Sequence, residues 1–309
     1  MDKKKVVIID GYHLLHKGYY GSLKRKKVAI NRDGVLINAV YVFVANVFQL
    51  VQSNEYHTVL VTFDVGKECW RKEIYPEYKA TRKETPSDLI PQMQLVRDFL
   101  TAANIPWYEK VKYEGDDIMG TISRIAVKLG YQVEIVSNDK DTYQLICDDV
   151  KVVSQQSKKC KQEIITKKEV FEKFGCKPCQ IPDIKSLLGD QSDNIKGVRG
   201  MHYNTATKLV AKYGCVENIY KNLTDFPEEQ RKKLELCKEK VLMNKQIAKI
   251  LKNVDIGRIN FKPLRINYIR FMGFLKREKM WAFTKMIEDK VKQQLSYREK
   301  IKTEIQELS

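Results

Sequence analysis

Val6-Val-Ile-Ile-Asp10 is a run of four apolar residues that ends in a carboxylate, and two later stretches repeat this arrangement. The later apolar runs span residues 58–63 and 132–136, and acidic residues follow each of them closely. Short apolar runs of this kind are typical of strands buried on both faces of a parallel sheet. Segments with helical periodicity separate the runs, at residues 38–51, 89–103 and 118–129. The alternation predicts an α/β domain with a mostly parallel central sheet.

The second half of the chain has a different pattern. After about residue 165 the strand patterns stop, and helical patterns occupy residues 167–174, 180–188, 204–213, 228–252 and 274–294. A chain of 309 residues is long enough for two domains. We therefore expect an α/β core at 1–165 and a mainly helical domain at 166–309.

The composition is strongly basic. Lys and Arg number 56 against 39 Asp and Glu, which gives a formal charge of +17. The expected partner is polyanionic, with nucleic acid first and an anionic membrane surface second. The longest apolar stretch, at 38–51, is shorter than the roughly 20 residues that span a bilayer. No secretory signal pattern is visible, so the expected location is the cytoplasm, associated with the nucleoid.

The cysteines do not indicate a disulfide framework or a zinc site. The seven cysteines are irregularly spaced in a chain of this size. Cys176-Lys-Pro-Cys179 has the spacing of half a zinc site, but no second pair of cysteines or histidines completes it.

Acidic residues follow each predicted strand. Open α/β sheets bind ligands beyond the carboxyl ends of their strands, so these side chains should meet at one edge. Two further acidic groups come directly before the helix at 118–129 and directly after Gly189. In the group before the helix, helix capping explains one or two acids but not three. The group after Gly189, taken alone, would indicate a turn. The nine acids are Asp10, Asp64, Glu114, Asp116, Asp117, Asp139, Asp141, Asp190 and Asp193.

Nine carboxylates at one edge need cations. Without them the groups would repel one another and raise one another's pKa. Oxygen ligands in this number suit Mg²⁺ or Mn²⁺ and not zinc. Two such ions about 4 Å apart can support in-line displacement at a phosphodiester. Since the sequence offers no competing Ser-His-Asp or Cys-His arrangement, metal-assisted phosphodiester hydrolysis is the favoured chemistry.

Several sequence blocks, in order, carry a resemblance to a known family. The chain resembles the 5′ nuclease domain of bacterial DNA polymerase I and the related phage and cellular flap endonucleases, from about Lys5 to Lys290. The resemblance implies a PIN-like core with a helical arch at about 66–90 and a helix–three-turn–helix motif at about 184–214. The blocks are Ile-Asp10-Gly-Tyr-His-Leu-Leu, Phe63-Asp64, Trp70-Arg71, Tyr75-Pro-Glu-Tyr78-Lys79-Ala-Thr-Arg82, Glu114-Gly-Asp116-Asp117, Asn138-Asp139-Lys-Asp141 and Leu188-Gly-Asp190-Gln-Ser-Asp193-Asn-Ile-Lys-Gly197.

The resemblance assigns the acids to two metal ions, expected to be Mg²⁺ with Mn²⁺ as a substitute. The first ion would be held by Asp10, Asp64, Glu114, Asp116 and Asp117. The second would be held by Asp139, Asp141, Asp190 and Asp193. Asp139 and Asp141 alternate in sequence, so they should point the same way if the chain stays extended there.

Basic residues supply the expected contacts with DNA. A helix beginning near Pro76 would place Lys79, Arg82 and Lys83 in one stripe. The resemblance gives Lys79 and Arg82 a catalytic contact with the scissile phosphate. In the hairpin, Arg199, His202 and Asn204 depart from the family pattern, and the family's turn can hold a potassium ion. Further expected DNA contacts are Tyr78, Lys83, Arg71, Gly197, Arg199, Gly200, Thr205 and Lys208.

The resemblance thus predicts a stand-alone, structure-specific 5′→3′ exonuclease and 5′-flap endonuclease. Its expected substrate is branched DNA with a 5′ flap or 5′ end, including RNA-primed ends, and its expected state is a monomer working with a separate DNA polymerase. A PIN-like ribonuclease is one alternative, which predicts neither the arch nor the glycine hairpin. A non-catalytic branched-DNA-binding protein is another, which predicts missing acids.

Overall fold

The computed structural model describes residues 3–26, 28–53, 55–66, 68–155 and 162–307. Its contacts divide the chain into two compact units. Unit 1 comprises the residues up to Asp10, then Thr62–Glu84 and Tyr108–Ile259. Unit 2 comprises Gly11–Val61, Thr85–Trp107 and the residues from Asn260 onward. The units interleave along the chain, and all nine acids belong to unit 1.

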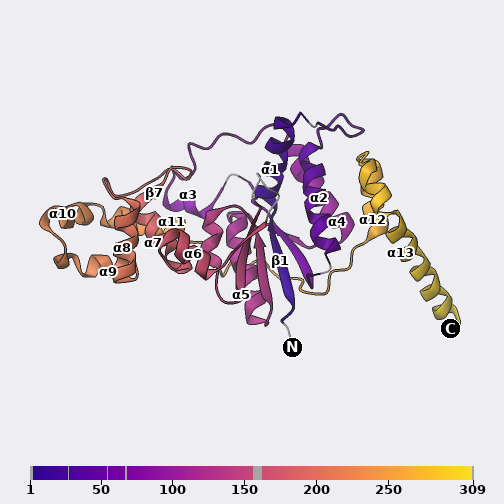
Figure 1. Ribbon diagram of the computed structural model, residues 1–309. Helices are drawn as coiled ribbons and strands as arrows, with labels where there is room; N and C mark the ends of the chain where they lie inside the picture. The colour runs from indigo at the N-terminus through magenta and orange to yellow at the C-terminus, as the bar shows by residue number, and fades with distance from the viewer. Residues whose placement is uncertain (1–2, 27, 54, 67, 156–161, 308–309) are drawn as a thin grey trace. The chain divides into compact units, whose positions relative to one another are not determined.

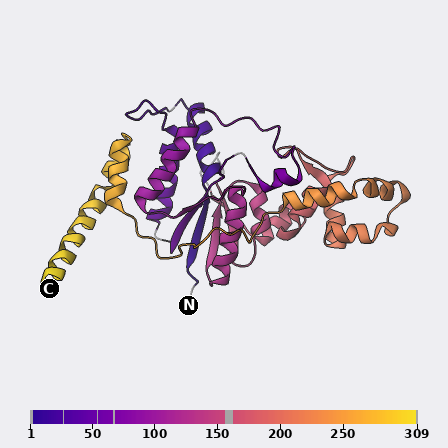
Figure 2. The same ribbon diagram turned by 180° about the vertical axis from the view of Figure 1, so that it is seen from behind.

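Four strands of unit 1 pair in a mostly parallel arrangement, which can be followed in Figures 1 and 2. β1 (Lys5–Asp10) and β4 (Gln132–Val136) pair in parallel, and β4 pairs in parallel with β5 (Val150–Gln155). β6 (Gln162–Ile165) runs antiparallel to β5. The two predicted strands here are confirmed, and the apolar residues of β1 are fully buried. β5 and β6 escaped prediction because their short apolar pairs are interrupted by polar residues.

Helix α5 (Gly115–Lys128) packs on β1 and β4. It begins three residues before its predicted start, so Asp116 and Asp117 lie in its first turn and not before the helix. Glu114 is the N-cap, and its backbone N–H donates to the Asp117 carboxylate at 3.4 Å. Acidic side chains are stabilised at this end because the helix dipole is positive there.

The remainder of unit 1 is mainly helical, as predicted, with a two-residue ladder between β7 (Gly189–Asp190) and β8 (Ile195–Lys196). The predicted single helix at 228–252 is wrong: α10 ends at Leu236 and α11 begins at Lys238. Buried Leu234 and Val241 are seven residues apart, a spacing that suits an unbroken helix and so conceals the break. The helices are α3 (Trp70–Ile74), α6 (Lys167–Phe174), α7 (Ile181–Leu188), α8 (Tyr203–Tyr213), α9 (Val216–Lys221), α10 (Glu228–Leu236) and α11 (Lys238–Ala248), with 3-10 turns η1 (Lys140–Leu145), η2 (Pro178–Gln180) and η3 (Leu223–Asp225).

Unit 2 is built from helices around an aromatic core. The Phe99 ring lies 5.1 Å from that of Phe271 and 6.3 Å from that of Phe43. None of the described helices is both long and apolar enough to cross a membrane. The elements are α1 (Gly11–Lys24), α2 (Asn38–Gln52), α4 (Ile90–Ala103), α12 (Tyr268–Arg277) and α13 (Trp281–Glu307), with β2 (Thr58–Thr62) and β3 (Trp107–Tyr108) extending across the unit boundary.

The predicted helix at 274–294 is interrupted. α12 ends at Arg277 and α13 begins at Trp281, with Lys279 between them in the left-handed region at φ 56°. The Glu278 side chain is buried and accepts a 2.8 Å hydrogen bond from the Asn31 amide. Burial of this carboxylate and the left-handed residue after it explain the break, and neither is visible in hydrophobic periodicity.

Gly197 is required by close packing. A Cβ there would lie 2.2 Å from the carbonyl carbon of Leu188, so the backbone itself would have to move. We expect Gly197→Ala to lower the free energy of unfolding by about 3 kcal/mol or more. Gly200→Ala is the matched control, because a Cβ at Gly200 would meet no neighbouring atom. The cost there comes from the left-handed backbone alone, at φ +78°. This variant should cost about 1–2 kcal/mol. Urea unfolding measures both, and equal losses would contradict this role for Gly197.

Candidate active site

The parallel pairing of β1 and β4 brings Asp10 next to the end of the neighbouring strand. The Ser137 hydroxyl donates to Asp10 Oδ2 at 2.9 Å and accepts from the Asp139 backbone N–H at 3.0 Å. The sequence predicts that Asp139 and Asp141 point the same way if the chain stays extended. It does not stay extended, because a 3-10 turn begins directly after Asp139. Asp139 caps η1 and accepts from the Asp141 N–H at 2.9 Å. Asp10 and Asp139 are therefore linked through one serine.

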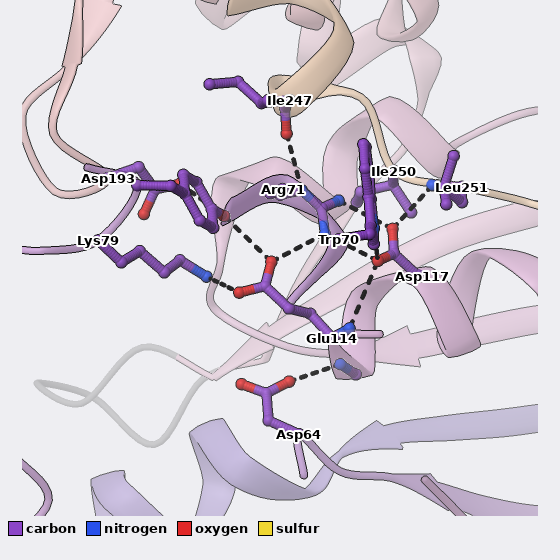
Figure 3. Close-up of polar contacts among 12 residues, drawn as sticks. Asp64, Trp70, Arg71, Lys79, Glu114, Asp117, Asp193, Ile247, Ile250 and Leu251 are labelled. Atoms are coloured by element: carbon purple, nitrogen blue, oxygen red, sulfur yellow. Dashed lines mark hydrogen bonds and ion pairs between the residues drawn. The ribbon is translucent and has the colours of Figure 1, made fainter. Parts of the chain in front are cut away.

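Two more acids join these at the start of α5. Asp64 Oδ1 accepts a 2.5 Å hydrogen bond from the Gly115 N–H, the first of the helix (Figure 3). Burial raises the pKa of Asp116 well above its usual range, and the charges of Asp139, Asp10 and Asp64 raise it further. Burial and Glu114 also raise the pKa of Asp64. We call Asp10, Asp64, Asp116 and Asp139 the strand-end cluster.

A second group of acids brings together η1 and the segment after α7. Asp141, Asp190 and Asp193 each offer a carboxylate oxygen, and these oxygens lie within 4.8 Å of one another. We call these three residues the loop cluster. Among the described residues this is the one group with the spacing of a metal site by that measure.

Lys185 is the residue that sequence reasoning missed. Its ammonium lies 2.5 Å and 2.6 Å from the Asp141 carboxylate oxygens and 2.6 Å from Asp190 Oδ2. Burial and Asp139 raise the pKa of Asp141 to about 6 although Lys185 opposes this. Burial also acts to raise the pKa of Asp190, but Lys185 and Ser192 outweigh it and hold that pKa at about 2. Lys185 lies on α7, five residues before Asp190, and this position was the sequence signal that could have identified it.

Glu114 is held by three different side chains. Its Oε2 accepts from Arg71 Nη1 at 2.9 Å and from the Tyr78 hydroxyl at 3.0 Å, and its Oε1 pairs with Lys79 (Figure 3). Burial acts to raise the pKa of Glu114, but the charges of Lys79 and Arg71 lower it below its usual value. The carboxylate is therefore ionised and oriented by neighbouring side chains.

Asp117 is set apart from the other eight acids. It is fully buried, and both of its oxygens are engaged (Figure 3). Arg71 donates to them at 2.7 Å and 2.8 Å, Trp70 Nε1 donates at 2.9 Å, and the Leu251 N–H donates at 2.9 Å. A carboxylate with this many donors has little capacity left for a metal ion.

Two predicted DNA contacts are buried instead. Arg71 is 2% exposed, and it also donates to the carbonyl oxygens of Ile247 at 2.8 Å and Lys249 at 3.1 Å. Tyr78 is 3% exposed and packs with Cys69, Ile195 and Ile247. The prediction that these two side chains contact DNA is wrong for this structure, because nucleic acid cannot reach them.

Lys79 and Arg82 reach the acids without the predicted helix. α3 ends at Ile74, and the chain from Pro76 to Arg82 forms turns. Lys79 has φ 57°, and its N–H donates to the Asp193 carbonyl at 3.0 Å. Arg82 Nη2 donates to Asp193 Oδ1 at 2.7 Å. The three side chains therefore do not form the predicted stripe. Lys79 and Arg82 pair with acids, whereas Lys83 is exposed.

The hairpin presents a mixed surface. Arg199, Gly200 and Lys208 are exposed, Thr205 is half-buried, and Gly197 packs against the backbone of Leu188. His202 has φ −99° and is the N-cap of α8. The left-handed residue of the turn is Gly200, at φ 78°. A histidine at position 202 thus causes no backbone strain.

The chain matches two family models in succession. Residues 5–175 match the family model for the N-terminal, resolvase-like domain of 5′-3′ exonucleases. Residues 176–270 match the model for their C-terminal domain, which has a SAM fold.

Curated relatives are polymerases much longer than this chain. DNA polymerase I of Bacillus subtilis is 35% identical over 285 residues, which is 92% of this chain and 31% of that protein. The thermostable DNA polymerase I of Thermus thermophilus is 33% identical over 249 residues, or 80% of this chain and 29% of that protein. The chain spans about a third of the length of these relatives.

Solved structures share the fold at lower identity. The T5 5′-exonuclease with divalent zinc ions is 23% identical, with a TM-score of 0.64 over 79% of this chain and 89% of that one. A T5 flap endonuclease in a complex with DNA and metal ions is 21% identical, with a TM-score of 0.65 over 94% of this chain and 100% of that one. The mostly parallel sheet and the helical C-terminal part thus match the fold of the T5 exonuclease. With both family models matched in order along residues 5–270, the chain belongs to the 5′-3′ exonuclease family.

Proposed function

We propose that this protein is a structure-specific 5′→3′ exonuclease and 5′-flap endonuclease that hydrolyses DNA near single-strand/duplex junctions with two divalent metal ions. The observation that carries this proposal is the meeting of two carboxylate clusters in one unit, with the cations of Lys79 and Arg82 beside them. Acids hold metal, and neighbouring cations bind the phosphate that the metal acts upon.

The donor chemistry fits the proposed ions. All the available side-chain ligands are carboxylates, which suit Mg²⁺, with Mn²⁺ as a substitute. Burial raises the pKa of Asp116, and repulsion by the other acids of the strand-end cluster raises it further; a divalent cation would relieve this repulsion. The loop cluster already holds one cation, the ammonium of Lys185. We assign Glu114 to the same metal ion as the strand-end cluster. We assign Asp117 to positioning Arg71.

The remaining steps belong to side chains of this protein. When bound, divalent cations supply a more acidic water and neutralise the departing oxygen. Lys79 and Arg82 exchange their carboxylate partners for the substrate phosphate and stabilise its developing negative charge. Arg199, Gly200 and Lys208 are exposed, and we assign them to the duplex backbone together with Thr205. Lys83 adds a cation for the single strand, and the hairpin turn is the proposed place for a potassium ion.

The biological setting follows from the same proposal. The expected substrates are flaps and 5′ ends left by replication and repair, including RNA-primed ends. The expected partner is a separate DNA polymerase, the expected state is a monomer, and the expected location is the cytoplasm, in association with the nucleoid. The boundary at 165/166 stays a prediction, close to the division at 175/176 between the two family models.

Cleavage of a labelled 5′-flap DNA tests the proposal. The protein should cut it near the junction with Mg²⁺ and not with EDTA. Single-stranded RNA tests the ribonuclease alternative, and binding of flap DNA without cutting tests the non-catalytic one. Uncut flap DNA at moderate salt in the presence of Mg²⁺ would overturn the assignment.

Lys185 should oppose metal binding at the loop cluster. Because its ammonium neutralises Asp141 and Asp190, we expect Lys185→Met to bind Mn²⁺ about tenfold more tightly. Lys185→Arg should retain the wild-type affinity, and Lys208→Met on the exposed side of α8 serves as the control. Titration of free Mn²⁺ by electron paramagnetic resonance measures this. An unchanged affinity in Lys185→Met would show that the lysine does not compete with the metal.

A further inference from the structure

Unit 1 contains a cavity that the nuclease function does not use. Its volume is about 700 Å³, and it is lined by residues of α5, η1, α6 and η2 and of the segment after α11. The α5 residues that line it run from Gly120 to Lys128, whereas Asp116 lies in the first turn. At a rise of 1.5 Å per residue, these residues lie roughly 6–18 Å along the helix from Asp116. This part of the lining is therefore separate from Asp116, and none of the nine acids is among the lining residues.

The cavity has an apolar floor with one available aromatic ring. Val127, Leu145 and Val150 line it, and Phe171 of α6 lines it with 62% of its surface exposed. An exposed phenylalanine ring in a concave site offers a face for stacking a flat ring system. Sites of 300–1,000 Å³ with apolar walls and a few polar groups are typical of small-molecule binding.

The charged residues that line the cavity are all cationic, although one of them, Lys167, pairs at 2.6 Å with Asp148 outside the lining. Five cationic side chains line the cavity, and none of the described lining residues is Asp or Glu. Burial lowers the pKa of Lys252, and no carboxylate is among the groups that act on it. Lys252 is still exposed, and an ammonium without an acidic neighbour attracts an anion. The five are Arg124, Lys128, Lys167, Lys177 and Lys252.

A buried hydroxyl of the lining also lacks a protein partner. Ser123 is 3% exposed, and its Oγ makes no hydrogen bond within the described part of the chain. An unsatisfied buried polar group costs about 1–3 kcal/mol. Rotation of this side chain toward the cavity would let it hydrogen-bond an oxygen or nitrogen atom of a ligand.

We propose that this cavity binds a small organic anion with a flat apolar body, of the size and chemistry of a nucleoside monophosphate. The ring system stacks on Phe171 above the apolar floor. The anionic group lies against Lys252 and the neighbouring cations, and Ser123 hydrogen-bonds a polar edge. This site is additional to the nuclease centre and does not depend on the proposed cleavage activity.

Calorimetric titration in EDTA tests the proposal, because chelation removes metal-bridged binding at the acids. Adenosine 5′-monophosphate should bind saturably, and more tightly than either adenosine or inorganic phosphate. Lys252→Met should weaken binding about tenfold, and Phe171→Ala by a similar factor. Lys168→Met is the matched control, since Lys168 is exposed on α6 and does not line the cavity. Absence of saturable binding, or affinities unchanged in both variants, would overturn the proposal.

Two thiols give an independent readout. Cys147 and Cys179 line the cavity and are exposed, whereas Cys237 lies between α10 and α11 outside the lining. Adenosine 5′-monophosphate should slow alkylation of Cys147 and Cys179 by iodoacetamide severalfold and leave Cys237 unaffected. Equal protection of all three, or protection by an acidic peptide alone, would count against a nucleotide-sized anion.

Discussion

Asp64→Asn should lower the rate of flap cleavage by about a thousandfold or more while flap DNA still binds. Asp64 belongs to the strand-end cluster and accepts from the Gly115 N–H, so the amide keeps the shape but loses the charge that holds metal. A loss of several kcal/mol of charge stabilisation corresponds to a rate change of this size. Single-turnover cleavage measures the rate, and fluorescence anisotropy of labelled DNA in Ca²⁺ measures binding.

The loop cluster should behave in the same way. Asp141→Asn removes one of its three carboxylates and should also abolish cutting. Asp289→Asn is the matched control, because that carboxylate is 91% exposed on α13. Wild-type cutting by either cluster variant would show that its acid is not a metal ligand. Loss of DNA binding in parallel with cutting would instead point to a fold defect.

The parts of the site that sequence predicts well are those that local patterns determine. An apolar run ending in an acid defines a strand and its carboxyl end, and parallel pairing then brings such ends together. This reasoning places Asp10 beside the β4 end, where the structure links it to Asp139 through Ser137. The strand-end cluster is thus predictable, because it requires only strand order and direction.

The errors arise where tertiary contacts override a local pattern. Tyr78 and Arg71 have the residue types of nucleic-acid contacts, but Glu114 and Asp117 pair with them in the interior. Lys79 has helical spacing from Arg82, but its backbone adopts a left-handed conformation to donate to the Asp193 carbonyl. Each outcome depends on a partner more than 30 residues away. Spacing along one segment carries no information about such a partner.

Arg71→Met should lower the free energy of unfolding by about 3–5 kcal/mol, the usual cost of removing one partner from a buried ion pair. The change would leave Asp117 fully buried without its bidentate donor, and the carbonyl oxygens of Ile247 and Lys249 without theirs. Urea unfolding in EDTA measures this loss separately from any effect of metal binding.

Two further variants identify the source of this loss. Arg71→Lys keeps the positive charge but cannot donate to both oxygens of Asp117, so it should recover only part of the stability. Lys83→Met removes an exposed cation and should change the unfolding free energy by less than about 0.5 kcal/mol. If Arg71→Met were as stable as Lys83→Met, the ion pair between Arg71 and Asp117 would not stabilise the site. If Arg71→Met unfolded early but Arg71→Lys retained wild-type stability, charge alone would suffice. A graded loss from arginine to lysine to methionine would show that the planar guanidinium is what holds Glu114 and Asp117 in place, and with them the start of α5 on which Asp116 sits.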